Sequence, residues 1–298
     1  MRRIGLVVHP SREIGLPLAT LHDWAGERQI EVVQLKTTGP SMRQVAPYGE
    51  LDACDLVVAI GGDGTTLTAL RAAADSAAPV LGVACGSLGA LSAVTAEQLN
   101  EALDNFEQGN WAPRKLDAIS VSTDTGSDHT AWALNDFVLV RRTGQLLVDI
   151  TIGSELYARV AGDGVIVATP LGSSAYSMAS GGPIIAAGTD AFVVTPLLMH
   201  GGCAPPIVVR DDTKVTLDAN PTYAGFDVEV DGHPMEVPNA TTFEIALCEH
   251  TATLVAMAEP GLGITALRRR GLVTDSPRVL ARDERAATKA AATANVPK

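Results

Sequence analysis

The stretch with the clearest chemical content is a glycine-rich turn that carries one carboxylate. Its residues are Gly61, Gly62, Asp63, Gly64 and Thr65. The apolar run 56–60 before it predicts a buried strand, and the run 67–74 after it favours a helix. Glycines at such a junction let the backbone turn sharply and point N–H groups into one concavity, where the helix N-terminus adds partial positive charge. The turn therefore predicts a phosphate-binding site.

Asp63 is the residue that a simple phosphate cradle does not need. A carboxylate there repels phosphate unless it binds a metal ion or accepts a proton from a reacting hydroxyl. We therefore predict that Asp63 is catalytic; the alternative is a tight turn in which Asp63 only caps the helix. The stretch matches neither a dinucleotide fingerprint, which needs glycine at position 67, nor a Walker A loop, which needs lysine after its last glycine.

Two further segments place glycine or polar residues where strands end or turn. The glycine turn 86–91 follows the apolar run 80–84, and we expect it to form a second wall of the same cleft, although a structural turn is the alternative. Asn135 and Asp136 interrupt the apolar run 131–142. Because unpaired polar groups are costly to bury, this pair either satisfies a bulge or faces a ligand.

The longest motif is a strand framed by an acidic residue and a hydroxyl-rich loop. Asp163 precedes the apolar run 164–169, and the loop after that run contains Ser174, Ala175 and Tyr176. Hydroxyl and backbone groups in such a loop can bind an adenine and its ribose while the aromatic ring covers a ring face. The alternative is a loop of Gly and Ser that only turns the chain.

The elements that must position these residues change character along the chain. Up to about residue 115, strands alternate with helices, as in a parallel sheet covered by helices. From about residue 116 to 257, many short strands separated by turns predict a sandwich-like domain. Residues 286–298 are rich in alanine and poor in large apolar side chains, so we expect a disordered tail. The predicted fold is an α/β nucleotide-binding domain followed by a β-rich domain.

Composition limits the classes of partner and compartment. The 298 residues carry a formal net charge of −12, which argues against general binding to nucleic acid or to anionic membranes. The four cysteines are far apart and form no Cys-x-x-Cys pair, which indicates neither a zinc site nor a disulfide framework. The N-terminus has no signal-peptide pattern and no apolar run is long enough to span a membrane. We expect a cytoplasmic protein.

Taken together, the four motifs resemble those of the NAD kinase family. The glycine turn with Asp63, the pair Asn135 and Asp136, the motif from Asp163 to Tyr176, and the run 181–184 occur in the family's order and approximate spacing. The resemblance covers about residues 4 to 270. It implies transfer of the γ-phosphoryl group of ATP, or of inorganic polyphosphate, to the 2′-hydroxyl of the adenosine ribose of NAD, with Mg²⁺ as cofactor. It also implies that the segment 258–285 returns to the first domain and that the protein assembles as a homodimer or homotetramer.

The resemblance also implies roles for individual residues. Asp63 would act as general base on the 2′-hydroxyl, and no protein side chain is assigned as a metal ligand. Donor phosphates would be held by Gly61, Gly62, Gly64 and Thr65. The NAD pocket would be formed by Asn135, Asp136, Asp163, Ser174, Ala175 and Tyr176.

Several positions depart from the family pattern. The chain has Asp136 where the family commonly has Glu, Leu171 where it has Thr, and Ala84 and Ala90 where it has Asn and Phe. Leu171 removes a hydroxyl from the expected pocket, and several such changes favour a different acceptor. Two alternatives to an NAD kinase therefore stay open: a kinase of the same fold that acts on another small alcohol or nucleoside, and a non-catalytic dinucleotide sensor.

Overall fold

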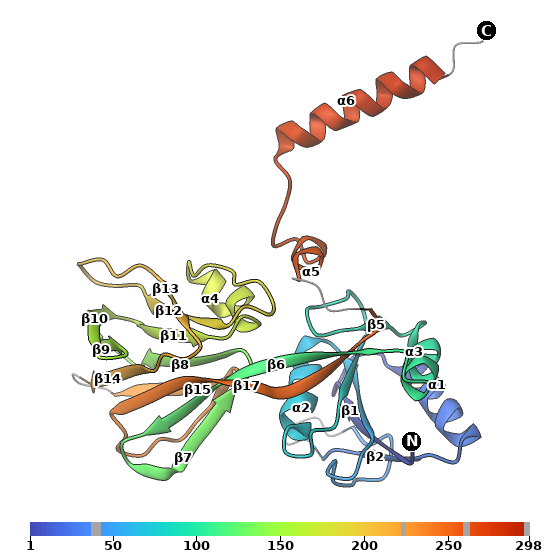
Figure 1. Cartoon of the computed structure of the whole chain (residues 1–298), viewed down its shortest axis with the longest axis horizontal. Coiled ribbons are helices and arrows are strands. Elements are labelled where there is room, and N and C mark those ends of the chain that lie inside the picture. Colours follow the sequence, from blue (N-terminus) through green and yellow to red (C-terminus); the bar gives the residue numbers. More distant parts are fainter. Residues whose placement is uncertain (37–42, 222–224, 259–262, 295–298) are drawn as a thin grey trace. The chain divides into compact units, whose positions relative to one another are not determined.

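The structure is a computed structural model that describes residues 1–36, 43–221, 225–258 and 263–294. The chain forms two compact units, Met1–Gly263 and Ile264–Lys298. The first unit contains every predicted site residue and consists of an α/β part and a β-sandwich part (Figure 1).

The α/β part is a parallel sheet between helices, as predicted. The strands follow the order β2-β1-β3-β4, with the short β5 beside β4, and all of these pairs are parallel. From β1 the chain continues to β2 on one side of β1, whereas β3 and then β4 are added on the other side. The sheet therefore has a switch point between β1 and β3. The elements are β1 (Arg3–Val8), α1 (Gly15–Glu27), β2 (Glu31–Gln34), β3 (Leu56–Gly61), α2 (Asp63–Ala73), β4 (Val80–Ala84), β5 (Val94–Thr95) and α3 (Leu99–Glu107).

The apolar composition of these strands follows from their position. All six residues of β3 are buried, because helices cover both faces of the sheet. One face packs against α1 and α3, in a cluster that includes Leu21, Trp24 and Leu103. The other face packs against α2 through Leu67 and Leu70. The helix that follows the glycine turn is thus fixed to the sheet by its own apolar side.

The second part is a sandwich of two sheets. One sheet has the order β13-β12-β11-β8-β15-β16, and the other continues the parallel sheet outward from β4 through β17, β14, β9 and β10, with β6 and β7 alongside. Two short helices, η1 (Gly172–Ser174) and α4 (Tyr176–Ala179), follow β11. The strands are β6 (Ala112–Thr123), β7 (Gly126–Ala133), β8 (Asp136–Arg141), β9 (Leu146–Ile152), β10 (Glu155–Gly162), β11 (Gly164–Ala168), β12 (Ala191–Leu197), β13 (Ile207–Arg210), β14 (Val215–Pro221), β15 (Phe226–Val230), β16 (His233–Pro234) and β17 (Thr242–Ala256).

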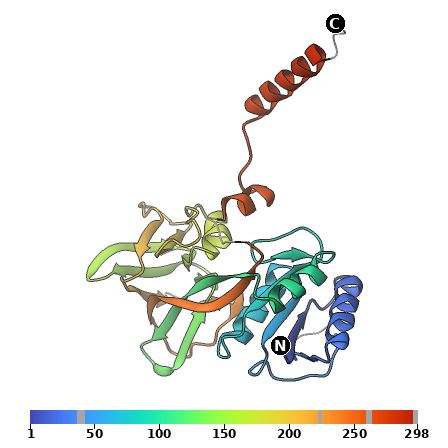
Figure 2. The ribbon, with the colours of Figure 1, turned by 45° about the vertical axis from the view of Figure 1, so that its right-hand side comes forward.

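Two long strands join the α/β part to the sandwich. β6 and β17 pair antiparallel over most of their length, and Leu254 of β17 also pairs parallel with Val80 of β4. In Figures 1 and 2 this green and orange pair runs from one part into the other. The sequence predicted only the segments 117–123 and 251–256 as strands, because polar residues such as Glu249 and His250 interrupt the apolar pattern at a shift in the pairing register. The two parts therefore share one continuous sheet.

The sandwich core lies between the two sheets. It contains side chains from both, among them Val165 and Val167 of β11 and Ile245 of β17. Phe137 and Phe243 pack across it with ring centroids 5.5 Å apart. This arrangement confirms the predicted α/β plus β-sandwich fold.

The C-terminal unit contains α5 (Ile264–Arg269) and α6 (Pro277–Ala294). The helix α6 extends over residues that the sequence predicted as a disordered tail, since alanine has the highest helix propensity even where few large apolar side chains are present. Within the described ranges, no helix combines the length and the apolar character that crossing a bilayer requires.

Candidate active site

The predicted strand-turn-helix junction is present and is shorter than expected. β3 ends at Gly61, Gly62 is the N-cap with extended backbone (φ −138°, ψ −168°), and α2 begins at Asp63. The helix thus starts four residues before the predicted run 67–74. Thr65 is buried in its first turn, and Gly64 is exposed. The N–H groups at the start of α2 lie at the carboxyl end of β3, the edge where open α/β sheets bind ligands.

Asp63 does not cap its own helix. Its carboxylate accepts hydrogen bonds from the N–H groups of Ala90 (2.8 Å) and Leu91 (3.0 Å) in the second glycine turn. A Cβ atom added at Gly89 would lie 2.0 Å from Asp63 Oδ1, so this turn approaches the carboxylate closely because residue 89 is glycine. The second glycine turn is therefore the wall against which Asp63 is held.

A cation lies beside Gly62 at the switch point of the sheet. A Cβ atom added at Gly62 would lie 3.0 Å from Arg12 Nη1, which donates to the carbonyl of Cys85 at 3.3 Å. Arg12 also lines a cavity of about 500 Å³ at this edge of the sheet. His9 is a turn residue here, because its Nδ1 accepts the N–H groups of Ser11 and Arg12. Arg12 is thus the side chain that can pair with an anion near Gly62.

Asn135 and Asp136 lie where the chain passes from one sheet to the other. The predicted single run 131–142 is two strands, β7 and β8, which belong to different sheets. The turn between them carries Asn135, and β8 begins at Asp136. Thr169 binds this turn from the neighbouring strand end, with its N–H donating to the Asn135 carbonyl at 3.0 Å. The turn and the hydroxyl-rich loop are thus brought together.

Asp136 has an unusual electrostatic environment. It is buried, and the pKa of its carboxyl is raised to about 7, first by burial and then by the negative charges of Asp231 and Glu229. No hydrogen bond to its carboxyl group comes from the described residues. A carboxyl in this state titrates near neutral pH and can either donate to a ligand or accept from one.

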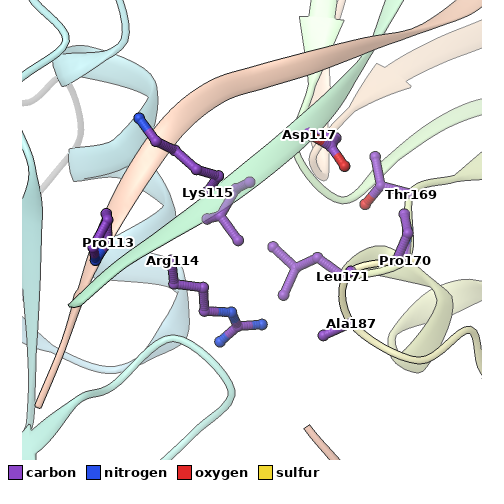
Figure 3. Close-up of a pocket in the computed structure, with 10 residues that line it drawn as sticks. Pro113, Arg114, Lys115, Asp117, Thr169, Pro170, Leu171 and Ala187 are labelled. Carbon is purple, nitrogen blue, oxygen red and sulfur yellow. The ribbon is translucent and has the colours of Figure 1, made fainter. Parts of the chain in front are cut away.

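The hydroxyl-rich loop forms one side of a cavity of about 540 Å³ between β11 and β6. Thr169, Pro170 and Leu171 line it from the loop, and Arg114 lines it from β6. In Figure 3 the Arg114 guanidinium points into the cavity toward Leu171, whereas Lys115 points to the other side of the strand. Arg114 Nη1 donates to the Ala90 carbonyl at 2.9 Å, so this cation lies beside the turn that holds Asp63.

The remaining loop residues of the predicted NAD pocket differ in exposure. Ser174 is buried and its hydroxyl donates to the Leu171 carbonyl at 3.3 Å. Ala175 is half-buried, and Tyr176 is 45 % exposed at the start of α4. An aromatic ring this accessible can cover a flat ligand without moving a core side chain.

Asp163 lies away from the other predicted residues. It precedes β11, whereas Thr169 follows that strand, and the six residue steps between them span about 20 Å in extended backbone. Its carboxylate pairs with Arg141 at 2.6 Å, and this hydrogen bond holds the pKa of Asp163 below its usual range. Within one chain, the structure therefore does not place Asp163 in the cavity with Leu171.

One apolar cluster joins the other motifs. It contains Leu67 of α2, Leu91 of the second glycine turn, Leu134 next to Asn135, and, packed against its edge, Leu171 of the hydroxyl-rich loop. Leu67, Leu134 and Leu171 are each within four positions of a predicted polar site residue, and the N–H group of Leu91 donates to Asp63. The cluster explains how segments more than 100 residues apart converge on one site.

Sequence reasoning missed several charged residues of this site. Arg12 lies beside Gly62, and Arg71 donates to the Trp132 carbonyl. Arg114 donates to the Ala90 carbonyl, and Asp231 accepts the Asn135 N–H. The only signal for Asp231 was its position before a glycine after the strand-like run 226–230, a pattern that also fits an ordinary turn. The arginines gave no signal, because only folding brings them near the glycine turns.

The chain is similar in sequence to NAD kinases. Models of the ATP-NAD kinase N-terminal and C-terminal domains match residues 19–111 and 134–257. An NAD kinase of Chlorobium phaeovibrioides is 33 % identical over 237 residues, which is 77 % of this chain and 84 % of that protein. An NAD kinase of Chlorobium chlorochromatii is 35 % identical over 235 residues, which is 76 % of this chain and 82 % of the relative.

Solved structures share the fold. Yeast NADH kinase complexed with NADH has a TM-score of 0.74 at 19 % identity, covering 93 % of this chain and 89 % of that one. An NAD kinase from Archaeoglobus fulgidus in complex with ATP has a TM-score of 0.69 at 20 % identity, covering 91 % of this chain and 100 % of that one.

Proposed function

The chain belongs to the NAD kinase family, and on that premise we propose that it transfers the γ-phosphoryl group of ATP to the 2′-hydroxyl of the adenosine ribose of NAD. The observation that carries the proposal is the similarity to NAD kinases over most of both chains, which includes every motif around the site. The products are NADP and ADP.

Asp63 is the proposed general base. It lies at the start of α2, and two backbone N–H groups hold its carboxylate in place, so the position of the carboxylate does not depend on a flexible donor side chain. A fixed carboxylate can orient the ribose hydroxyl and accept its proton as the phosphoryl group is transferred. A base of this kind contributes about 10² to 10⁴ in rate.

The donor phosphates are proposed to bind at the N-terminus of α2. The backbone N–H groups that would bind them, and the space for the phosphates to approach the backbone, come from Gly61, Gly62, Gly64 and Thr65. Arg12 adds a positive charge beside Gly62. Phosphoryl transfer depends mainly on positioning and on neutralising charge, which this edge of the sheet provides. Polyphosphate offers the same phosphate chemistry and is the alternative donor.

The adenosine ribose of NAD is proposed to enter the cavity between β6 and the hydroxyl-rich loop. Arg114 lines this cavity and would face the phosphates of the dinucleotide. The residues proposed to bind the dinucleotide from the adjoining turn and loop are Asn135, Asp136, Ser174, Ala175 and Tyr176. Asp163 keeps its predicted role in NAD binding as a proposal, although it lies at the other end of β11.

Mg²⁺ is the proposed metal cofactor. The described residues contain no group of three or more His, Cys, Asp or Glu that could hold a metal ion by itself. Mg²⁺ usually keeps several waters and binds together with substrate phosphates, so the donor phosphates at the N-terminus of α2 would supply its main ligands. When bound there, the ion would neutralise charge on the donor phosphates.

Assembly, compartment and domain limits are also proposals. We propose a homodimer or homotetramer in the cytoplasm, with domains at 1–115 and 116–257 and with 258–285 returning to the first. Sedimentation velocity at micromolar concentration would show the assembly directly, and a monomer would contradict it.

The test of the function is a coupled assay for NADP formed from NAD, ATP and Mg²⁺, with calorimetry for NAD and ATP as the second measurement. Turnover of NAD supports the kinase. Binding of NAD without turnover would instead support a dinucleotide sensor, and no binding of NAD would favour a kinase for another alcohol.

A further inference from the structure

The turn that carries Asn135 and Asp136 has backbone groups that neither sheet can pair. It connects β7 in one sheet to β8 in the other. The N–H groups of three successive residues all point to the carboxylate of Asp231, at 3.1 Å for Leu134, 2.7 Å for Asn135 and 3.3 Å for Asp136. Successive N–H groups that converge in this way form an anion-binding nest. Here the anion is a side chain of the protein itself.

Asp231 is placed at this nest by its own backbone. It follows β15, has a left-handed φ of 52°, and donates its N–H to the Asp136 carbonyl at 2.9 Å. Its side chain has no exposed surface. Among residues other than glycine, aspartate and asparagine tolerate this backbone conformation best. A carboxylate buried so completely needs a cationic partner as well as hydrogen bonds.

Arg71 is that partner. Its Nη1 lies 2.5 Å from Asp231 Oδ2 and 3.2 Å from the Trp132 carbonyl, and its guanidinium lies 5.1 Å from the centre of the Trp132 ring. Arg71 is in the last turn of α2, the helix that begins at Asp63. One 11-residue helix therefore connects the proposed base to the turn that carries the proposed NAD-binding residues.

The same turn is held on its opposite side. Thr169 donates its N–H to the Asn135 carbonyl at 3.0 Å, and a Cβ atom added at Gly172 would lie 1.9 Å from that oxygen. The Asn135 amide group makes no hydrogen bond to the described residues. The backbone of Asn135 is thus fixed, whereas its side chain is available to a ligand.

We propose that Asp231 and Arg71 are positioning residues for the acceptor, which hold Asn135 and Asp136 at a fixed place relative to Asp63. The inference rests on the proposed function and adds two residues to it that touch neither substrate. Loss of Asp231 or Arg71 should therefore weaken NAD binding more than it weakens ATP binding or lowers the overall stability.

The main variant is Asp231→Asn, which keeps the size of the side chain and removes its charge. Its single amide oxygen cannot serve three N–H groups and Arg71 together. We expect KM for NAD to rise about tenfold or more, KM for ATP to stay within about twofold, and kcat to fall less than KM rises. The matched control is Asp227→Asn in β15, the strand that Asp231 follows; Asp227 pairs with the exposed Arg142 and not with the turn. It should leave all three constants unchanged.

A role in stability alone is separated from positioning by the pH profile. Asp231 and Glu229 are the charged groups that raise the pKa of Asp136. In the wild type, KM for NAD should therefore change near pH 7, and in Asp231→Asn the inflection should move to lower pH because one negative charge is gone. An unchanged inflection and an unchanged KM, together with a lower Tm, would overturn the proposal.

Hydrogen exchange distinguishes failure of the proposal from failure of the proposed function. The amides of residues 134–136 should exchange faster in Asp231→Asn than in Asp227→Asn, whether or not the protein phosphorylates NAD. If Asp231→Asn does not fold, Arg71→Met removes the ion pair with Asp231 and the contacts with Trp132 but leaves the Asp231 carboxylate in place for the three N–H groups, and it should raise KM for NAD in the same direction. Equal exchange in the two Asp variants, or an Arg71→Met variant with wild-type KM for NAD, would contradict the positioning role of Asp231 and Arg71.

Discussion

The two turns of the site are built in opposite ways. The turn at Asp63 consists of neighbouring residues, since the glycines, the carboxylate and the helix N-terminus lie within five positions of the chain. The turn at Asn135 depends on groups far away in sequence, because Asp231 is 96 positions further on and Arg71 is 64 positions before it. The first carries the proposed base, and the second carries residues proposed to hold the acceptor. We therefore expect the chemical step and NAD binding to respond to different substitutions.

The largest effect is expected at the turn that carries Asp63, from the variant Asp63→Asn. An amide can hydrogen-bond the ribose hydroxyl but cannot accept its proton, so kcat should fall about 10² to 10⁴-fold with little change in the Kd for NAD. Single-turnover rates and calorimetry measure the two quantities separately. Near-normal turnover would show that Asp63 is structural.

The turn that carries Asn135 and Asp136 predicts a stability that depends on pH. The pKa of Asp136 is raised from 3.8 to about 7, so the folded state binds a proton more tightly than the unfolded state. The free energy of unfolding should therefore decrease as the pH rises from about 4 to 7, by up to roughly 4 kcal/mol, and then level off.

The matched variant for this prediction is Asp136→Asn, which removes the titrating group. Relative to the wild type it should be more stable at pH 8 and show no such gain near pH 4, as measured by urea unfolding at both values. If the free energies of unfolding of the wild type and the variant change with pH in the same way, ionisation of Asp136 costs the folded state no free energy, and the prediction is wrong.

Gly89→Ala tests whether the second glycine turn holds the base. The added methyl group would lie 2.0 Å from Asp63 Oδ1, so the carboxylate must shift away from its two N–H donors. We expect kcat to fall about 10 to 100-fold because of this displacement. Gly26→Ala is the control, since no atom lies within 4 Å of the added Cβ. Equal activity of the two variants would remove the positioning role of the turn.

The smallest effect is expected at Leu171, where the chain departs from the family. Leu171→Thr restores a hydroxyl to the proposed pocket and should leave kcat/KM for NAD unchanged or raise it up to about tenfold. Leu171 also packs against the apolar cluster around Leu67 and Leu134, so Tm must be measured in parallel. A loss of activity with Tm preserved would instead favour an acceptor other than NAD.

The contrast between the two turns also explains what could be predicted from the sequence. The alternation of strands and helices, the sandwich and the junction at Asp63 follow from patterns that span a few residues. The 15-residue strand β17 was only partly predicted, because its central polar residues lie at a register shift. The positioning roles of Asp231 and Arg71 could not be predicted, since they exist only after residues 71, 135 and 231 have come together.

The central claim is tested most directly by identifying the product. Purified protein incubated with NAD, ATP and Mg²⁺ is analysed by ³¹P NMR and by an NADP-specific dehydrogenase assay. The proposed function predicts equal amounts of NADP and ADP, with the new phosphate on the 2′-hydroxyl of the adenosine ribose and with product formation strongly reduced in Asp63→Asn. ADP without NADP, or turnover that Asp63→Asn leaves intact, would contradict it.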